Sequence, residues 1–400
     1  MDYRPLPEDR EEQFQQYTQY AFRPQAGPTD EYGDPPSERP GEPRALFDGD
    51  RMLCVCKHHW FRARLRGQWF EMPGVAAVAS PPEHRRKGYV TRLMAESLAE
   101  YRERGDVLSA LWAFKHPFYE HLGWGLANKF VRYECAPRAL AFARDHASGE
   151  FRRLEADEYE LLDPVIAAHA RGYELEIDRT EKWWRKRIFE SWRGDPYVYV
   201  WEKDGEARGY VGYRIRDGDD GRLLQAYEFA HADREARLNL LRFVANHDSQ
   251  VERATIYTPH DTSLLDEADD PEDVECEVEP GPMVRLVDVP AAFEALDYPE
   301  APNAEFTISV EDTLADWNDA TFRVAVEDGQ ATCEPLPDSP TADSDPDATA
   351  DVSALSQIYA GYHSVEDAEV FGELEVRDSA TREALAAMFP ERDVFLREGF

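Results

Sequence analysis

Residues 74–94 read GVAAVASPPEHRRKGYVTRLM. The small and apolar residues 74–80 predict a buried strand, residues 85–87 place three cations in the following turn, and an amphipathic helix begins after Gly88. Backbone N–H groups at the start of a helix lack intrahelical partners and lie at the positive end of its dipole. A glycine, which has no Cβ, lets an anion approach the backbone closely. The stretch therefore predicts a cradle for a pyrophosphate group with cations at its rim; the alternative is an ordinary solvated helix cap.

The rest of the chain is strongly acidic. Its 400 residues contain 81 Asp and Glu against 45 Lys and Arg, for a net charge of -36. Since 42% of the residues are hydrophobic, the chain is not disordered and can fill several cores. Such a surface suits concentrated counter-ions, which screen its repulsion, so we expect a halophilic protein that needs molar salt. The same charge argues against nucleic acids and anionic membranes as partners, because phosphate groups bind to basic faces.

The sequence also predicts the cellular compartment of the protein. No apolar run reaches the roughly 20 residues that a membrane span needs, and the N-terminal residues 1–4, MDYR, do not resemble a signal peptide. The five cysteines do not suggest a disulfide framework. We therefore expect a cytoplasmic protein with no membrane partner.

Cys54, Cys56 and His58 alternate along one predicted strand, so their side chains would share one face. Cysteine and histidine are metal ligands, but structural metal sites of this kind are typically four-coordinate, and no fourth ligand is apparent nearby. We favour the alternative, in which the cysteines pack within a sheet, and predict no metal.

The pattern of predicted elements divides the chain into three parts, residues 1–150, 151–284 and 285–400. In the first part we expect a mixed sheet flanked by helices, with strands at 45–48, 51–63, 68–80, 107–113 and 129–136 and helices at 5–22, 88–104 and 117–122. The second part repeats that order more loosely, with helices at 157–170, 180–192 and 234–246 and strands at 197–202, 209–216 and 223–229. The third part begins with RLVDV at 285–289. There we expect strands at 305–310, 320–326 and 330–334, helices at 290–296, 352–361 and 380–388, and a solvated insertion at 335–350.

The strand-to-helix turn of the second part differs from that of the first. Residues 230–234 read AHADR, without a glycine and with an added acid. We therefore predict that the second part lacks a working anion cradle.

The first part resembles the GNAT-type N-acetyltransferases. The cofactor motif of that family, Arg/Gln-x-x-Gly-x-Gly/Ala, corresponds here to Arg85-x-x-Gly88-x-Val90, with Val90 in place of the usual small residue. Residues 118–125, FYEHLGWG, are similar to the family's Phe-Tyr-x-x-x-Gly-Phe segment.

Over its whole length the chain resembles the Eis-like (enhanced intracellular survival) branch of this family. The three-part order, the phrase VRLVDV at 284–289 and the terminal Phe400 carry this resemblance. It implies an α/β (α+β) architecture in which two tandem acetyltransferase domains, the second degenerate, precede a sterol-carrier-like domain. It also implies a homo-oligomer, a hexamer.

The resemblance further implies acetyl-CoA as cosubstrate. The strand edge at Val78, Ala79 and Ser80 would hydrogen-bond the pantetheine arm and the thioester carbonyl. Phe114 and Lys115 would lie beside the cofactor arm. The pyrophosphate would be held by Arg86, Lys87, Gly88, Tyr89, Val90 and Thr91.

Two catalytic groups are implied as well: Tyr119 as a hydrogen-bond donor to the departing sulfur, and the terminal carboxylate of Phe400 as the base for the amine. A tyrosine, with a pKa of about 10, is a weaker acid than a thiol at about 8.5, so stabilising the thiolate is favoured over full proton transfer. A terminal carboxylate, with a pKa of about 3.5, would position the amine and accept its proton late. The alternatives are a packing role for Tyr119 and a frayed end at Phe400, although the apolar residues 394–396 favour docking.

The implied reaction is transfer of the acetyl group to a primary amine of a cationic substrate, such as a polyamine, an aminoglycoside or a lysine side chain. Glu398 would attract such an amine, or is only a surface residue of a salt-adapted protein. The alternative function is that of a non-catalytic acyl-CoA-binding or regulatory protein that keeps the fold. A lipid-carrier role for the last domain is a third hypothesis, which rests on fold likeness alone.

Overall fold

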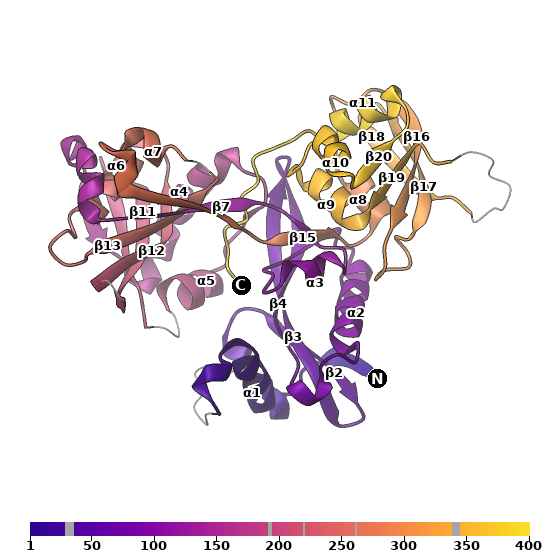
Figure 1. Ribbon diagram of the computed structural model, residues 1–400, viewed down its shortest axis with the longest axis horizontal. Coiled ribbons are helices and arrows are strands. Elements are labelled where there is room, and N and C mark those ends of the chain that lie inside the picture. The colour runs from indigo at the N-terminus through magenta and orange to yellow at the C-terminus, as the bar shows by residue number, and fades with distance from the viewer. Residues whose placement is uncertain (29–35, 191–193, 219–220, 261, 338–344) are drawn as a thin grey trace. The chain divides into compact units, whose positions relative to one another are not determined.

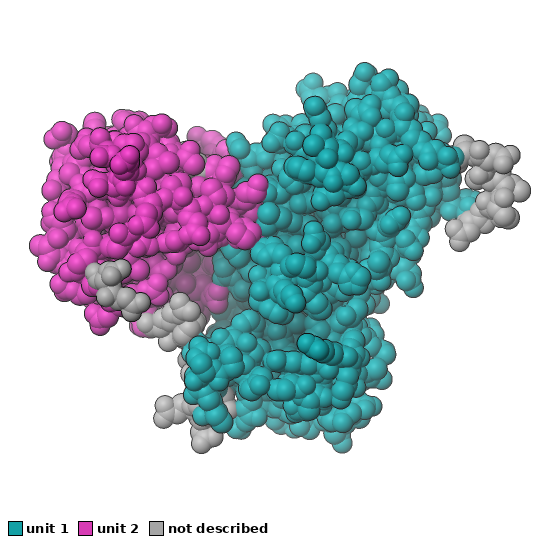
Figure 2. All heavy atoms as spheres, viewed as in Figure 1, with its two compact units in different colours: residues 1–127, 282–400 teal, residues 128–281 magenta. Residues whose placement is uncertain are grey.

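Two long antiparallel strands, β3 (Arg51–Leu65) and β4 (Gln68–Ala79), form the central hairpin of the first sheet. The computed structural model describes residues 1–28, 36–190, 194–218, 221–260, 262–337 and 345–400. These fold into two units: residues 1–127 together with 282–400, and residues 128–281 (Figure 2). None of the helices in the described ranges is long and apolar enough to cross a membrane.

The first sheet is mixed, and its strand order is not the chain order. Strands follow one another as β1-β2-β3-β4-β5-β15-β6, and β4 and β5 are parallel. Figure 1 labels β2, β3, β4 and β15 of this sheet. The remaining strands are β1 (Asp2–Pro5), β2 (Glu42–Asp48), β5 (Leu108–Leu111), β15 (Met283–Leu286) and β6 (Gly125–Leu126). The late strand β15 pairs with both β5 and β6, so the sheet is completed by residues far along the chain.

Helices cover both faces of this sheet. Alternate residues of β3 point to opposite faces: Cys54 and Cys56 pack in the core under α2 (Tyr89–Arg104), whereas Val55 packs with Phe14 of α1 (Glu11–Phe22). The helices and strands predicted between residues 45 and 122 are thus confirmed, with ends shifted by a few residues.

The remainder of the first unit contains a second sheet with its own helices. Its five-stranded sheet has the order β18-β17-β16-β19-β20. The strands are β16 (Ala304–Glu311), β17 (Ala320–Glu327), β18 (Gln330–Pro335), β19 (Ala348–Asp351) and β20 (Leu374–Val376). The helices are α8 (Val289–Ala295), α9 (Val352–Ala360), α10 (Val365–Phe371) and α11 (Ser379–Met388). Helix α9 is buried along its whole length, and Ser356 Oγ accepts a hydrogen bond from Leu286 N of β15 at 2.8 Å.

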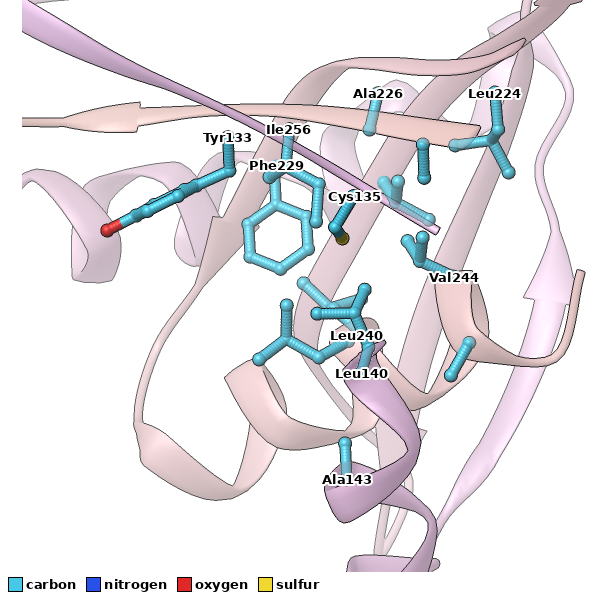
Figure 3. Packing of buried hydrophobic residues seen from close by; sticks show 14 of the residues in the cluster. Tyr133, Cys135, Leu140, Ala143, Leu224, Ala226, Phe229, Leu240, Val244 and Ile256 are labelled. Carbon is cyan, nitrogen blue, oxygen red and sulfur yellow. The ribbon is translucent and has the colours of Figure 1, made fainter. Parts of the chain in front are cut away.

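The second unit is built around a seven-stranded sheet with the order β14-β7-β13-β12-β11-β10-β8. The strands are β7 (Lys129–Cys135), β8 (Glu150–Arg153), β10 (Tyr197–Lys203), β11 (Glu206–Gly218), β12 (Gly221–His231), β13 (Arg253–Pro259) and β14 (Val274–Pro280). The helices are α4 (Asp163–His169), α5 (Glu181–Trp183), α6 (Arg234–Ala245) and α7 (Leu264–Glu267). Figure 3 shows its core, where Leu240 and Val244 of α6 pack with Leu140, Cys135 and Ile256.

Several expectations from the sequence were wrong. The strand predicted at 129–136 does not end the first sheet; it is β7 of the second unit, paired with β13 and β14. Arg285 and Leu286, at the start of the predicted third part, belong to β15 of the first sheet instead. The periodicity of a strand shows which of its faces is buried but not which sheet it joins, and this explains both errors.

Other elements were missed or have a different form. The helix predicted at 180–192 is α5 followed by a π-helical turn, Trp184–Phe189. In the insertion predicted at 335–350, Ala348–Asp351 forms β19, and residues 338–344 lie outside the described ranges. Strands β1, β6, β8, β9 (Glu176–Ile177), β13, β14 and β20 and helices α7 and α10 were not predicted. The division into three domains at 150 and 284 stays a prediction.

Candidate functional site

The start of α2 forms an open cradle of backbone amides. Gly88 precedes the helix with a φ of 77°, and Arg86 has a φ of 58°, so two left-handed residues flank Lys87. Such alternation turns successive N–H groups toward one point and creates an anion-binding concavity. Gly88 has no side chain that could cap the first turn, and a Cβ built on it meets no atom within 4 Å. The first-turn amides of residues 89–91 thus have no side-chain cap from Gly88 and no intrahelical partner, as an anion site requires.

The turn that carries the cations is anchored to β3 and β4. His84 is buried, and its Nδ1 lies 3.0 Å from the Leu53 carbonyl oxygen. Arg85 Nε donates to the Ser80 carbonyl at 3.0 Å, and Lys87 Nζ donates to the Glu83 carbonyl at 2.7 Å. Arg85, Arg86 and Lys87 are all exposed, so their charge surrounds the mouth of the cradle without a desolvation cost.

The corresponding helix of the second unit begins differently. Asp233 caps α6, and its Oδ1 accepts from Ala236 N at 3.0 Å. Arg208 in turn pairs with the same carboxylate at 2.5 Å. Because a carboxylate already occupies the start of α6, this end is closed to an anion, which agrees with the prediction made from residues 230–234.

Strand β4 carries a bulge beside the cradle. Ala77 has a φ of 51°, and the register with β3 shifts between Val55 and Lys57, so that one extra residue of β4 is accommodated there. The parallel ladder to β5 comprises Gly74 with Ala110 and Val75 with Leu111.

Beyond Val75, β4 has no ladder partner in the described part of β5. The edge of β4 that faces away from β3 is therefore open to an extended ligand beyond Val75. Val78 packs against the core under α2, and Ser80 Oγ donates to the Leu53 carbonyl at 3.4 Å.

Tyr119 lies on the short helix α3 (His116–Glu120) in an aromatic setting. Its ring is 2% exposed, and the ring centroids of Phe118, Phe114 and Trp124 lie 5.1, 5.7 and 6.5 Å away. The hydroxyl makes no hydrogen bond with any residue that the structure describes. Burial raises the pKa of Tyr119 well above its usual value. The group is therefore a hydrogen-bond donor throughout the physiological pH range.

The C-terminal tail, residues 389–400, docks on the first sheet, and Figure 1 shows it ending beside β4. Leu396 is fully buried and Glu398 is 5% exposed, so Glu398 is not the surface residue that one alternative supposed. Trp112 Nε1 donates to the Glu398 carbonyl at 2.5 Å. The ring of Phe400 packs edge-on against Phe61, with centroids 4.8 Å apart. The alternative of a frayed end at Phe400 is therefore wrong.

Gly74 makes this docking sterically feasible. A Cβ at this position would lie 2.6 Å from the Phe61 ring and 2.7 Å from the Phe400 ring. Gly74 and the bulge residue Ala77 are three positions apart on one strand, or about 10 Å. The structure thus brings the tail, the free edge of β4 and the cradle to one strand–turn–helix segment.

Three residues of this site were missed by sequence analysis. His59 and Phe61 form the wall against which the Phe400 ring rests, and Trp112 holds the tail backbone. His59 and Phe61 look like ordinary alternating strand residues, and Trp112 like the end of a strand. The only local signal was Gly74, since a glycine within a strand often marks a close approach of other groups.

On the opposite face of β3, the cysteines pack in the core as predicted. Cys54 and Cys56 are fully buried, and His58 Nε2 lies 3.5 Å from Cys56 Sγ and 3.1 Å from Ser97 Oγ. Within the described ranges no three His, Cys, Asp or Glu side chains could hold a metal ion together. The absence of a metal stays a prediction. Burial lowers the pKa of His58 to about 3, although Glu100 Oε2 lies 3.6 Å from its Nδ1.

We predict that His58 makes the fold sensitive to acid. Between the unfolded pKa of about 6.5 and the folded pKa of about 3, the unfolded chain binds a proton that the folded chain does not. The free energy of unfolding should therefore fall by about 1.4 kcal/mol for each pH unit below about 6.5. Urea unfolding at constant KCl between pH 7.5 and 5 measures this slope. His58→Asn is the control, and an equal slope in both proteins would contradict the prediction.

Three protein-family models match the chain. A model described as Acetyltransferase (GNAT) domain matches residues 2–127, and a second model of the same description matches residues 175–286. A model described as Sterol carrier protein domain matches residues 289–397.

Similar proteins match most of the chain. An uncharacterized N-acetyltransferase of Streptomyces avermitilis is 26% identical over 370 residues, which cover 89% of this chain and 88% of that protein. N-acetyltransferase Eis of Mycobacterium bovis is 26% identical over 342 residues, covering 79% and 77%. The crystal structure of Eis1 from Mycobacterium abscessus has a TM-score of 0.76 and 22% identity, and covers all of both chains. The resemblance inferred from residues 85–90 and 118–125 is confirmed.

Proposed function

Because the chain belongs to the GNAT-type N-acetyltransferases of the Eis-like branch, we propose that it transfers the acetyl group of acetyl-CoA to a primary amine of a cationic substrate. The substrate classes that we propose are a polyamine, an aminoglycoside-like molecule or a lysine amine. The net charge of -36 favours cationic over anionic substrates at close range, since the molar salt that we expect the protein to need screens attraction over longer distances.

The observation that carries this proposal is the contact between Phe400 and Gly74 of β4. The strand that receives the terminal residue is also the strand whose free edge and following turn suit a thioester and a pyrophosphate. An acyl donor bound along this edge would therefore end near the terminal carboxylate. A protein that only bound acyl-CoA would have no need for a docked tail at this point.

We assign the cofactor contacts as follows. The amides of residues 88–91, with Arg86 and Lys87 at the rim, bind the pyrophosphate by hydrogen bonds and charge. The backbone of residues 78–80 binds the pantetheine arm and the thioester carbonyl. Phe114, which is 68% exposed, and Lys115 cover the arm.

Tyr119 acts on the leaving group. When the amine nitrogen attacks the carbonyl carbon, a C–N bond forms, the C–S bond breaks and negative charge develops on sulfur. The Tyr119 hydroxyl donates a hydrogen bond to that sulfur. Because burial raises its pKa, it stabilises the thiolate and does not surrender its proton.

The terminal carboxylate acts on the amine. It orients the amine toward the carbonyl carbon and accepts its proton, directly or through water, as the nitrogen becomes acidic during attack. Most of the acceleration comes from holding the thioester next to a neutral amine.

The test is thiol release from acetyl-CoA at molar KCl across a panel of polyamines, aminoglycosides and lysine peptides, with acetyl-CoA binding measured in parallel by calorimetry. Release that depends on the amine supports the proposal. Binding of acetyl-CoA without release by any amine would favour the alternative, a non-catalytic acyl-CoA-binding or regulatory protein.

We predict that Gly88→Ala raises the KM for acetyl-CoA by about tenfold. The new Cβ would occupy the open space in front of the cradle, and the left-handed backbone costs an L-residue about 1 kcal/mol. Gly105→Ala is a matched control, because Gly105 ends the same helix with a φ of 84° and no atom within 4 Å of a built Cβ. Both variants should lose similar stability in urea. An equal rise in KM for both would contradict the cradle assignment.

A further inference from the structure

The segment that follows Tyr119 is held by side chains from a distant part of the chain. Helix α3 is short, and the carbonyl groups beyond its end need hydrogen-bond donors. Arg285 Nη1 donates to the Leu122 carbonyl at 2.5 Å, and Thr313 Oγ1 donates to the His121 carbonyl at 3.1 Å. Both donors lie more than 160 residues from the carbonyls that they satisfy.

Arg285 is a fully buried cation with a fixed position. Its side chain is 0% exposed and pairs with Asp312 Oδ2 at 2.5 Å. Asp312 is itself held by the backbone N–H groups of Leu314 and Ala315, at 2.9 and 3.0 Å from its Oδ1. Arg285 therefore has little freedom to move relative to the loop that follows β16.

Gly123 leaves the space that the Arg285 guanidinium occupies. It has a φ of 85°, and a Cβ built on it would lie 1.7 Å from Arg285 Nη1. The guanidinium also lies over the Trp124 ring, 5.1 Å from its centroid. Arg285 thus contacts the loop after Tyr119 through the Leu122 carbonyl, the bare face of Gly123 and the Trp124 ring.

The same loop fixes Tyr119. Leu122 N and Trp124 N both donate to the Tyr119 carbonyl at 3.0 Å. The Trp124 ring, which lies beneath the guanidinium, also packs edge-on against the Tyr119 ring. Two of the contacts of Arg285 on this loop, those with Leu122 and Trp124, are therefore one residue away from Tyr119.

We propose that Arg285 is a positioning residue for the Tyr119 hydroxyl, and that the Arg285–Asp312 pair makes the sterol-carrier-like part of the chain a scaffold for the acetyltransferase site. This inference rests on the proposed function, because it presupposes that Tyr119 acts on the leaving sulfur. A buried ion pair with a merely structural role would affect stability but not the catalytic use of one particular hydroxyl.

The test is a kinetic double-mutant cycle. Arg285→Met with Asp312→Leu removes both charges together, so that neither is left buried alone. We expect this pair to lower kcat by about 10- to 100-fold, as small displacements of catalytic groups do. We expect no further loss when the pair is combined with Tyr119→Phe. Equal losses with and without the Tyr119 hydroxyl, or no loss, would overturn the proposal.

A milder variant keeps the test decisive if that pair of substitutions does not fold. Thr313→Ala removes only the exposed hydroxyl that holds the His121 carbonyl. It should lower kcat to a smaller extent, again only when Tyr119 is present, while Thr332→Ala, an exposed threonine on β18, should not. Acetyl-CoA binding by calorimetry confirms an intact cradle in each variant. If the wild-type protein shows no amine-dependent thiol release, the proposed function is wrong, and this inference is wrong with it.

Discussion

Adding one glycine after Phe400 should lower kcat/KM for the amine by about 100- to 1,000-fold, which lies within the range that a general base typically contributes. The extension turns the carboxylate of Phe400 into a neutral amide and moves the new carboxylate about 3.8 Å farther along the chain. It leaves in place the contacts that hold the tail, namely the Trp112 hydrogen bond to the Glu398 carbonyl and the Phe400 ring against Phe61. The loss should therefore reflect the charged group alone.

Two further variants separate the effect of the terminal carboxylate charge from the effect of the docked Phe400 ring. An extra glycine at the N-terminus is the matched control and should leave the rate unchanged. Phe400→Leu keeps the terminal carboxylate but removes the aromatic contact, and should have a smaller effect than the extension. Thiol release is measured at molar KCl, with acetyl-CoA binding measured separately. Equal rates for the extended and the unextended protein would remove Phe400 from the mechanism but leave the enzyme.

Tyr119→Phe should lower kcat by about 100-fold with little change in the KM for acetyl-CoA. The ring keeps its packing against Phe118 and Trp124, and the hydroxyl has no hydrogen-bond partner in the described part of the structure. The free energy of unfolding should therefore change little. Because burial raises the pKa of Tyr119, the wild-type rate should not fall through loss of this proton near pH 10.

Tyr101→Phe is the control for this substitution. Tyr101 is also a fully buried tyrosine, and its hydroxyl likewise has no partner among the residues that the structure describes. It lies on α2 and packs against His58, with ring centroids 4.8 Å apart. Rates and stabilities for both variants are compared under the same conditions. A loss of kcat as large in Tyr101→Phe as in Tyr119→Phe would mean that buried hydroxyls matter here for folding rather than for the reaction.

The parts of the site that the sequence predicted are those encoded locally. The strand, the turn with its cations, Gly88 and the helix after it occupy consecutive residues, and short-range rules describe each of them. Because these features depend on backbone geometry within a few positions, a single sequence is enough to predict them. Tyr119 was identified differently, from the resemblance of residues 118–125 to a segment of a known family.

The parts that could not be predicted depend on contacts between distant residues. Nothing near Phe61 or Trp112 indicates that the end of the chain packs there, and Arg285 looks like one cation in a strand. The exchange of β7 and β15 between the predicted parts has the same cause, since a strand's own pattern does not specify its partner. The only local signs of these long-range contacts were Gly74 and Gly123. A glycine alone does not identify the group that packs against it.

The position of β15 in the first sheet has a consequence for how the protein is made. A ribosome delivers β5 and β6 long before it delivers Met283–Leu286, the strand that lies between them. Throughout the synthesis of residues 128–281, the nascent chain therefore carries an unpaired edge at β5, and such edges favour aggregation. The acetyltransferase sheet can close only after most of the polypeptide has emerged. Premature termination anywhere before β15 should yield an insoluble fragment rather than a smaller working enzyme.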